Sequence, residues 1–152
     1  MAAKSKKLSI NDMEEDFFSE TAMIGIICAL PAYHLCWKIN EYFDFNFECD
    51  PELTLPFCRS DITSYFPVFE YKLPNSNHSY LLYKVKNEQA SLLQSSHKGT
   101  WLSKLDFIWL IKTGQPEYEA RYIIDKLKQI NWITMSHEID SQEIKNIENL
   151  IV

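Results

Sequence analysis

Glycine is scarce in this sequence, with only three residues among 152. The glycine-rich loops that bind nucleotide phosphates are absent, since neither GxGxxG nor GxxxxGK[ST] occurs. Basic residues are also in the minority: 15 Lys and Arg stand against 21 Asp and Glu, and the formal net charge is −6. Binding to a nucleic-acid backbone needs clustered positive charge, so this balance argues against a nucleic acid as partner.

Motifs for catalysis or metal binding are missing as well. The four cysteines, at positions 28, 36, 49 and 58, contain no CxxC pair, and no two of the four histidines stand two or four residues apart. Zinc sites usually need such close pairs, and disulfide frameworks are typical of secreted chains. No GxSxG nucleophile motif occurs. We therefore expect reduced thiols, no catalytic residue, no metal and no cofactor.

The sequence also lacks a long apolar run. The longest, at residues 22–30, follows an acidic stretch and is cut by Pro31 after nine residues. A membrane-spanning helix needs about 20 apolar residues, so we expect a cytoplasmic protein without a membrane partner.

The apolar content is high, at 46% hydrophobic and 14% aromatic residues, which excludes a disordered chain. A chain of this size buries roughly 70% of its unfolded surface and needs neither a metal nor a disulfide to stay folded. We expect residues 1–20 to form a flexible leader and residues 21–152 to form a single domain.

Two strand–helix units frame the sequence. The apolar strand 22–30 runs into a helix opened by Pro31, and the apolar strand 105–112 precedes a helix opened by Pro116. Between them, alternating residues at 65–73 and 79–86 flank a Pro-Asn-Ser-Asn turn and predict a hairpin. A last strand is expected at 132–139, followed by a short helix or turn.

This order predicts an α+β fold with a mainly antiparallel sheet and two helices packed on one face. It is similar to a ferredoxin-like plait with an enlarged middle. The split crossovers of that plait place strands 22–30 and 105–112 side by side at the sheet centre. Because each strand also feeds a helix opened by proline, we expect the two to run parallel. Both strands are apolar on both faces, as central strands require.

Four blocks of the chain carry a resemblance to a known family: IGIICALPAYHLCWKINEYF, DPELTL, LDFIWLIKTG, and EID with ENLIV near the end. Together they resemble the IPExxxVDY family of small bacterial proteins over roughly residues 22–152. Leu105-Asp106-Phe107 stands where the family has Val-Asp-Tyr, so Asp106 is retained, whereas Gly99-Thr100-Trp101 replaces Ile-Pro-Glu. The resemblance implies the extent of the domain and assigns no activity.

Asp106 is the polar residue with the most unusual place, because it stands at the entrance of an apolar strand. A carboxylate there either accepts backbone N–H groups or lies at the mouth of a pocket.

The aromatic residues are the remaining functional signal, and Trp101, Trp109, Tyr80 and Tyr83 are our candidates for an interface or a ligand site. Exposed aromatics serve either a protein interface or base stacking on an open sheet. The acidic balance favours the protein interface.

The central strands leave a second apolar sheet face that something must cover. The candidates are the leader with Phe17 and Phe18, the C-terminal segment with Ile144 and Ile147, or another copy of the chain. We expect a non-enzymatic protein-interaction or self-associating domain that forms a homodimer, or a stable complex with another protein, through this face. The alternative is an ACT-like regulatory domain that binds a small molecule near the ends of the central strands.

Overall fold

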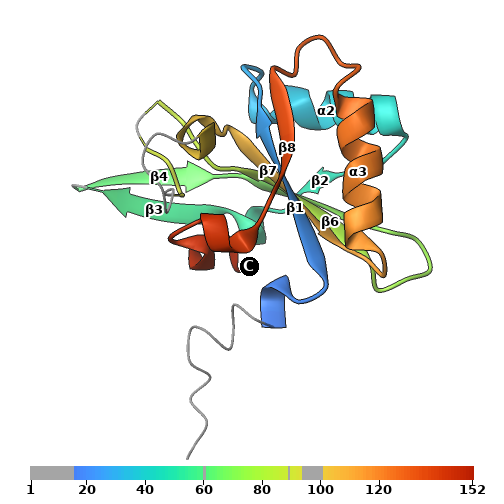
Figure 1. The fold of residues 1–152 in the computed structure, drawn as a ribbon. Coiled ribbons are helices and arrows are strands. Elements are labelled where there is room, and N and C mark those ends of the chain that lie inside the picture. The colour runs from blue at the N-terminus through green and yellow to red at the C-terminus, as the bar shows by residue number, and fades with distance from the viewer. Residues whose placement is uncertain (1–15, 60, 89, 94–100) are drawn as a thin grey trace, which may run out of the picture.

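The computed structural model describes residues 16–152 except for residues 60, 89 and 94–100 (Figure 1). Six strands form one sheet in the order β2-β5-β6-β7-β1-β8, and β3 and β4 form a two-stranded sheet. The strands are β1 (Thr21–Ile27), β2 (Glu48–Cys49), β3 (Leu55–Arg59), β4 (Ile62–Phe66), β5 (Val68–Lys72), β6 (Ser79–Lys84), β7 (Phe107–Lys112) and β8 (Met135–Ile139). The longer helices are α2 (Ala32–Phe43) and α3 (Pro116–Leu127), and a helical turn at residues 16–18 precedes β1. Short 3₁₀ segments are η1 (Pro51–Leu53), η2 (Trp101–Lys104), η3 (Ser141–Glu143) and η4 (Ile147–Leu150).

The two apolar strands lie beside each other inside the large sheet. β1 pairs with β7 on one side, with Ile24 opposite Trp109, and with β8 on the other. Nearly every residue of both strands is buried, because each face of the sheet is covered. The prediction of an α+β fold with a mainly antiparallel sheet is confirmed, as is the adjacency of these strands.

The predicted parallel pairing is wrong, since β1 and β7 run antiparallel. Every pairing in this sheet is antiparallel. The split crossovers of a ferredoxin-like plait leave one strand between the two strands that they connect, so antiparallel neighbours are compatible with that plait. A strand that is apolar on both faces is recognisable as internal, but its residues carry no signal for its direction. The successive antiparallel pairings of β5, β6 and β7 set the direction of β7.

The first core cluster joins the two long helices to the sheet. It contains the inward residues of α2 and of α3, among them Leu35, Ile39, Ile123 and Leu127, packed with Trp109 of the sheet. Each helix buries one stripe at the helical repeat, as the apolar spacing in the sequence predicts.

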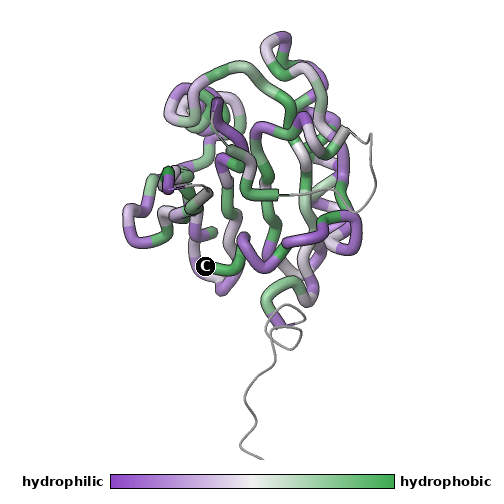
Figure 2. Tube along the Cα trace, turned by 90° about the vertical axis from the view of Figure 1, so that its left-hand side faces the viewer, coloured by the Kyte–Doolittle hydropathy of each residue, from purple (hydrophilic) through white to green (hydrophobic). Residues whose placement is uncertain are grey.

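The second sheet face is covered by other parts of the same chain. Its cluster joins residues of the strands to Phe66 of the β3–β4 hairpin and to Ile144 and Ile147 of the C-terminal segment. Phe17 and Phe18 pack against it as partly buried residues, while residues 1–15 of the predicted leader lie outside the described residues. Figure 2 shows the hydrophobic residues gathered in the strands and the hydrophilic ones in the outer loops. Among the described residues, the second sheet face is therefore not left uncovered, and the reason for expecting a homodimer through that face is removed.

Candidate functional site

Three of the four aromatic candidates belong to the core. Trp109 on β7 and both Tyr80 and Tyr83 on β6 are buried. Trp109 and Tyr80 pack in the first cluster with 5.7 Å between their ring centroids. Tyr83 faces the second cluster, where its hydroxyl donates a hydrogen bond to the carbonyl oxygen of Leu150 at 2.7 Å. A partner that docks on the folded surface does not contact these three rings.

The fourth aromatic candidate, Trp101, is the first residue of η2. Its side chain lies outside the described part of the structure, so its role in an interface remains a sequence-based expectation.

The hydroxyl of Tyr80 belongs to a small polar group at the start of α3. It donates to Glu119 Oε1 at 2.7 Å, and the Thr113 hydroxyl donates to Glu119 Oε2. Burial, reinforced by the Glu119 carboxylate, raises the pKa of Tyr80 well above its ordinary value. A protonated tyrosine donates a hydrogen bond and cannot act as a base. The role of this group is therefore structural: its hydrogen bonds hold the first turn of α3 against the sheet.

Asp106 acts as a backbone acceptor between two strands. Its Oδ2 accepts a hydrogen bond from the backbone N–H of Cys28 at 3.0 Å, just beyond the end of β1. The side chain is half-buried, and none of the three cavities described below includes it in its lining. The geometry matches the first of the two roles that the sequence left open, a carboxylate that satisfies backbone N–H groups.

The histidines do not assemble a metal centre in the described chain. His34 on α2, His78 in the β5–β6 turn and His137 on β8 are exposed and lie on separate elements, and His97 lies outside the described residues. Within residues 16–152, apart from the undescribed positions, no three His, Cys, Asp or Glu side chains come together in a way that could hold a metal ion.

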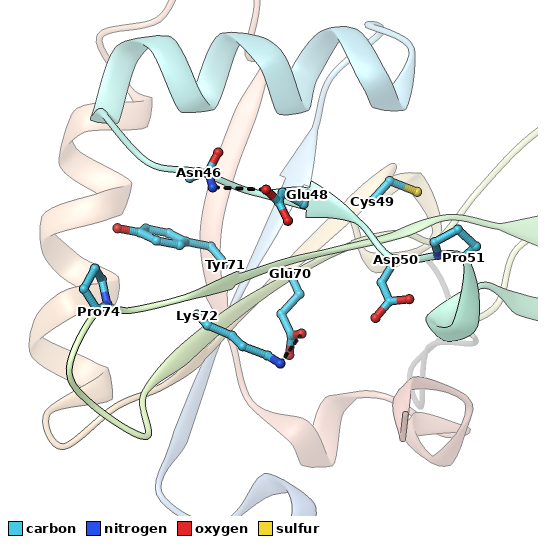
Figure 3. Close-up of a pocket in the computed structure, with 9 residues that line it drawn as sticks. All are labelled: Asn46, Glu48, Cys49, Asp50, Pro51, Glu70, Tyr71, Lys72 and Pro74. Carbon is cyan, nitrogen blue, oxygen red and sulfur yellow. Dashed lines mark hydrogen bonds and ion pairs between the residues drawn. The ribbon is translucent and has the colours of Figure 1, made fainter.

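A cavity of about 450 Å³ lies at the β2 edge of the sheet. Figure 3 shows Glu70 and Lys72 on one side of β5 and Tyr71 on the other. The ammonium of Lys72 lies 3.8 Å from Glu70 Oε1, and Asn46 Nδ2 donates to Glu48 Oε1 at 3.2 Å. The lining residues are Asn46, Glu48, Cys49, Asp50, Pro51, Glu70, Tyr71, Lys72 and Pro74. The cavity is thus a polar cleft at an open sheet edge, lined by charges of both signs. Its lining contains neither an assembled acid–base pair nor a nucleophile paired with a base.

A smaller cavity of about 280 Å³ lies at the end of β7, beside Lys112. The Lys112 ammonium lies 3.6 Å from the centroid of the Phe17 ring. Burial lowers the pKa of Lys112, and the Glu70 carboxylate acts in the opposite sense. Asp16, Glu20 and His78 also line this cavity, so its charge is mixed.

A third cavity, of about 230 Å³, lies between the starts of β1 and α3 and the end of β8. Its ionisable lining residues are all acidic: Glu117, Glu138 and Asp140. The lining contains no lysine, arginine or histidine to balance these negative charges, and it contains no nucleophile paired with a base.

Exposed aromatic side chains gather instead on the outer faces of the two helices. The exposed fractions are 66% for Tyr33, 60% for Trp37 and 42% for Tyr42 on α2, and 71% for Tyr118 and 52% for Tyr122 on α3. These are five of the eight large hydrophobic residues exposed in the described chain. The sequence does hold a signal for them, because Tyr33 with Trp37 and Tyr118 with Tyr122 repeat at i,i+4 outside the apolar stripes.

Lysines accompany these rings. Lys38 Nζ lies 5.8 Å from the ring centroid of Trp37 and 5.3 Å from that of Trp132. Lys126 Nζ lies 6.0 Å from the Tyr42 centroid and 5.2 Å from that of Tyr122. Contacts of this kind hold amphipathic rings at the surface with part of each face open to solvent.

Comparison with known proteins adds no assignment, since no family model, curated protein or solved structure matches this chain. In the described ranges, none of the helices combines the length and the apolar composition that crossing a bilayer requires.

Proposed function

We propose that this chain is a non-enzymatic protein-interaction domain that binds its partner through the outer faces of α2 and α3. The observation that carries this proposal is the concentration of exposed tyrosine and tryptophan on these two helices. Single exposed hydrophobic residues are common on any protein, whereas repeated aromatic ones on two neighbouring elements are not.

Physical chemistry favours these side chains as contact residues. Tyrosine and tryptophan offer a large rigid area with few rotatable bonds, so little entropy is lost when a partner immobilises them. Each also has a polar group that stays hydrated in the free protein. Three of the aromatic residues first expected in this role, Trp109, Tyr80 and Tyr83, are buried, so the proposal moves the interface from the sheet to the helices.

The test is capture from an extract of the source cells with the purified chain as bait. The double variant Trp37→Ala/Tyr118→Ala is compared with the unmodified chain and with Tyr65→Ala, a matched control. Tyr65 lies on β4 and is 67% exposed, close to the exposure of Trp37 and Tyr118. At least one protein should bind the unmodified chain and the control and be lost from the double variant. Identical captured proteins for all three baits would overturn the proposal.

A second candidate function is regulatory binding of a small molecule in the cleft at the β2 edge. Its volume of about 450 Å³ falls in the range of ligand sites, roughly 300–1,000 Å³. The cleft lies at an edge strand and not at the ends of central strands, where an ACT-like domain would bind its ligand. A ligand screen by thermal shift, repeated on Glu70→Gln, tests it: a hit that loses its shift in the variant supports the cleft, and no hit rejects it.

A further inference from the structure

The outer face of α3 is exposed along its whole length. Seven residues around this helix and its end are exposed: Glu117, Tyr118, Arg121, Tyr122, Asp125, Lys128 and Gln129. The opposite stripe, from Ala120 to Leu127, is buried against the sheet. Figure 1 shows α3 on the outside of the sheet. A partner helix can therefore approach this face without displacing another element.

The charges on this face alternate in sign along the chain: Glu117, Arg121, Asp125 and Lys128. Within the described residues none of the four makes an ion pair. Read from the other end of the helix, these four charges have the opposite signs, so two antiparallel copies of the helix can place each charge opposite one of the other sign. In an antiparallel helix pair related by a twofold axis near residue 123, Glu117 lies opposite Lys128 of the second copy. Arg121 then lies opposite Asp125 of the second copy.

The positions around the helix agree with this pairing. At about 100° per residue, Glu117, Arg121 and Lys128 fall on one edge of the exposed face and Tyr122 falls on the other. In an antiparallel pair with twofold symmetry, like edges meet. The charged edge therefore meets its complement, and Tyr122 meets Tyr122 of the second copy.

We propose that a second copy of this chain docks on α3, antiparallel to it, with Glu117–Lys128 pairs on one edge, Arg121–Asp125 pairs towards the middle of the face and the two Tyr122 rings on the other edge. This inference rests on the proposed function, for which it names the partner. A pair of helices about 18 Å long buries less than a standard interface, so the dimer is weak and in rapid exchange. Exposed charge pairs are screened by salt, so the dimer weakens as ionic strength rises.

A charge-swap experiment tests the pairing by sedimentation velocity at low ionic strength, with a concentration series up to about 1 mM. Arg121→Glu places an acidic side chain opposite Asp125 of the second copy in both pairs of a homodimer, and Asp125→Lys places a basic side chain opposite Arg121 in both. Each variant alone should dimerise about tenfold more weakly or worse than the unmodified chain. An equimolar mixture of the two should dimerise again, because every opposing pair then has opposite charges. Lys104→Glu, an exposed charge reversal on η2, should dimerise like the unmodified chain.

Three outcomes overturn the inference: a monomeric unmodified chain throughout the series, single variants that dimerise normally, or a mixture that stays monomeric. Circular dichroism of each variant shows that its helices remain folded. If the chain is monomeric while capture still loses a protein in Trp37→Ala/Tyr118→Ala, the helix surface binds a different partner and only this inference fails. If capture also shows no difference, the proposed function fails with it.

Discussion

The side chain of Asp106 and the backbone of Cys28, 78 positions apart in the sequence, are joined by a hydrogen bond of 3.0 Å. The backbone of Asp106 extends the connection. Its N–H donates to the carbonyl oxygen of Ile26 at 3.0 Å, and its own carbonyl accepts from the N–H of Val85 at 2.9 Å. One residue thus ties the entrance of β7 to the end of β1 and to the residue that follows β6.

Replacement of Asp106 should destabilise the fold because the N–H of Cys28 loses its acceptor. Asp106→Ala should lower the free energy of unfolding by about 1–3 kcal/mol, the usual cost of a buried donor left unpaired. Asp106→Asn keeps a carbonyl oxygen at the same place and should recover most of this loss. Urea unfolding followed by tryptophan fluorescence measures both, and equal stability of Asp106→Ala and the unmodified chain would refute the role.

The four thiols should react at very different rates. Cys28 and Cys36 are buried, Cys49 is half-buried and Cys58 is exposed. Burial raises the pKa of the Cys28 thiol, and it raises the pKa of Cys36 to about 12, so the reactive thiolate is rare at both positions. With iodoacetamide at pH 8, mass spectrometry should find Cys58 labelled first and Cys28 and Cys36 last. In urea the four rates should converge, and rapid native labelling of Cys28 and Cys36 would contradict their place in the core.

The raised pKa of the Cys36 thiol should make the free energy of unfolding depend on pH in the alkaline range. The pKa of Cys36 rises from its ordinary 9.0 to about 12 on folding, chiefly through burial. Above pH 9 the unfolded thiol loses its proton while the folded one keeps it, so the free energy of unfolding falls as pH rises. For one proton the slope is at most about 1.4 kcal/mol per pH unit. Urea unfolding at pH 8, 9 and 10 should show a shallower slope in Cys36→Ala, and parallel slopes would contradict the assignment.

The C-terminal segment should be needed to cover the second sheet face. Ile147 is buried there, and Asn149 Nδ2 holds the segment by donating to the carbonyl oxygen of Leu92 at 2.8 Å. Ile147→Asp introduces an unpaired charge into an apolar site and should lower the free energy of unfolding by about 2 kcal/mol or more. Exposed apolar surface should then increase the fluorescence of a hydrophobic dye. Lys145→Asp, an exposed position two residues away, is the control and should leave dye binding unchanged.

The sequence alone predicted the elements with the strongest patterns. Strands 22–30 and 105–112 are apolar on both faces, and the structure places them as adjacent internal strands β1 and β7. Helices α2, which follows Pro31, and α3, which begins at Pro116, are each predicted by a helical apolar repeat opened by proline. Residues 44–64 gave no clear pattern, yet they contain β2, β3 and the start of β4. Strands this short, interrupted by Pro51 and Pro56, show too few alternations to be recognised.

The site was less predictable than the fold. Counting aromatic residues pointed to Trp109, Tyr80 and Tyr83, which are buried, because composition does not tell a core ring from a surface ring. The i,i+4 pairs on the polar sides of the two helices were the usable signal. They become informative only when the buried stripe of each helix is known.

Outside residues 44–64, the sequence by itself determined which segments are strands and helices and which of their faces are apolar, because these properties depend on residues near each other in the chain. The direction of β7, the chain segment that covers the second sheet face and the partner of the Asp106 carboxylate were decided by the tertiary structure. Each of them depends on contacts between residues far apart in sequence, such as Cys28 with Asp106 and Tyr83 with Leu150. Local patterning sets what must be buried, and only the packed chain sets what buries it.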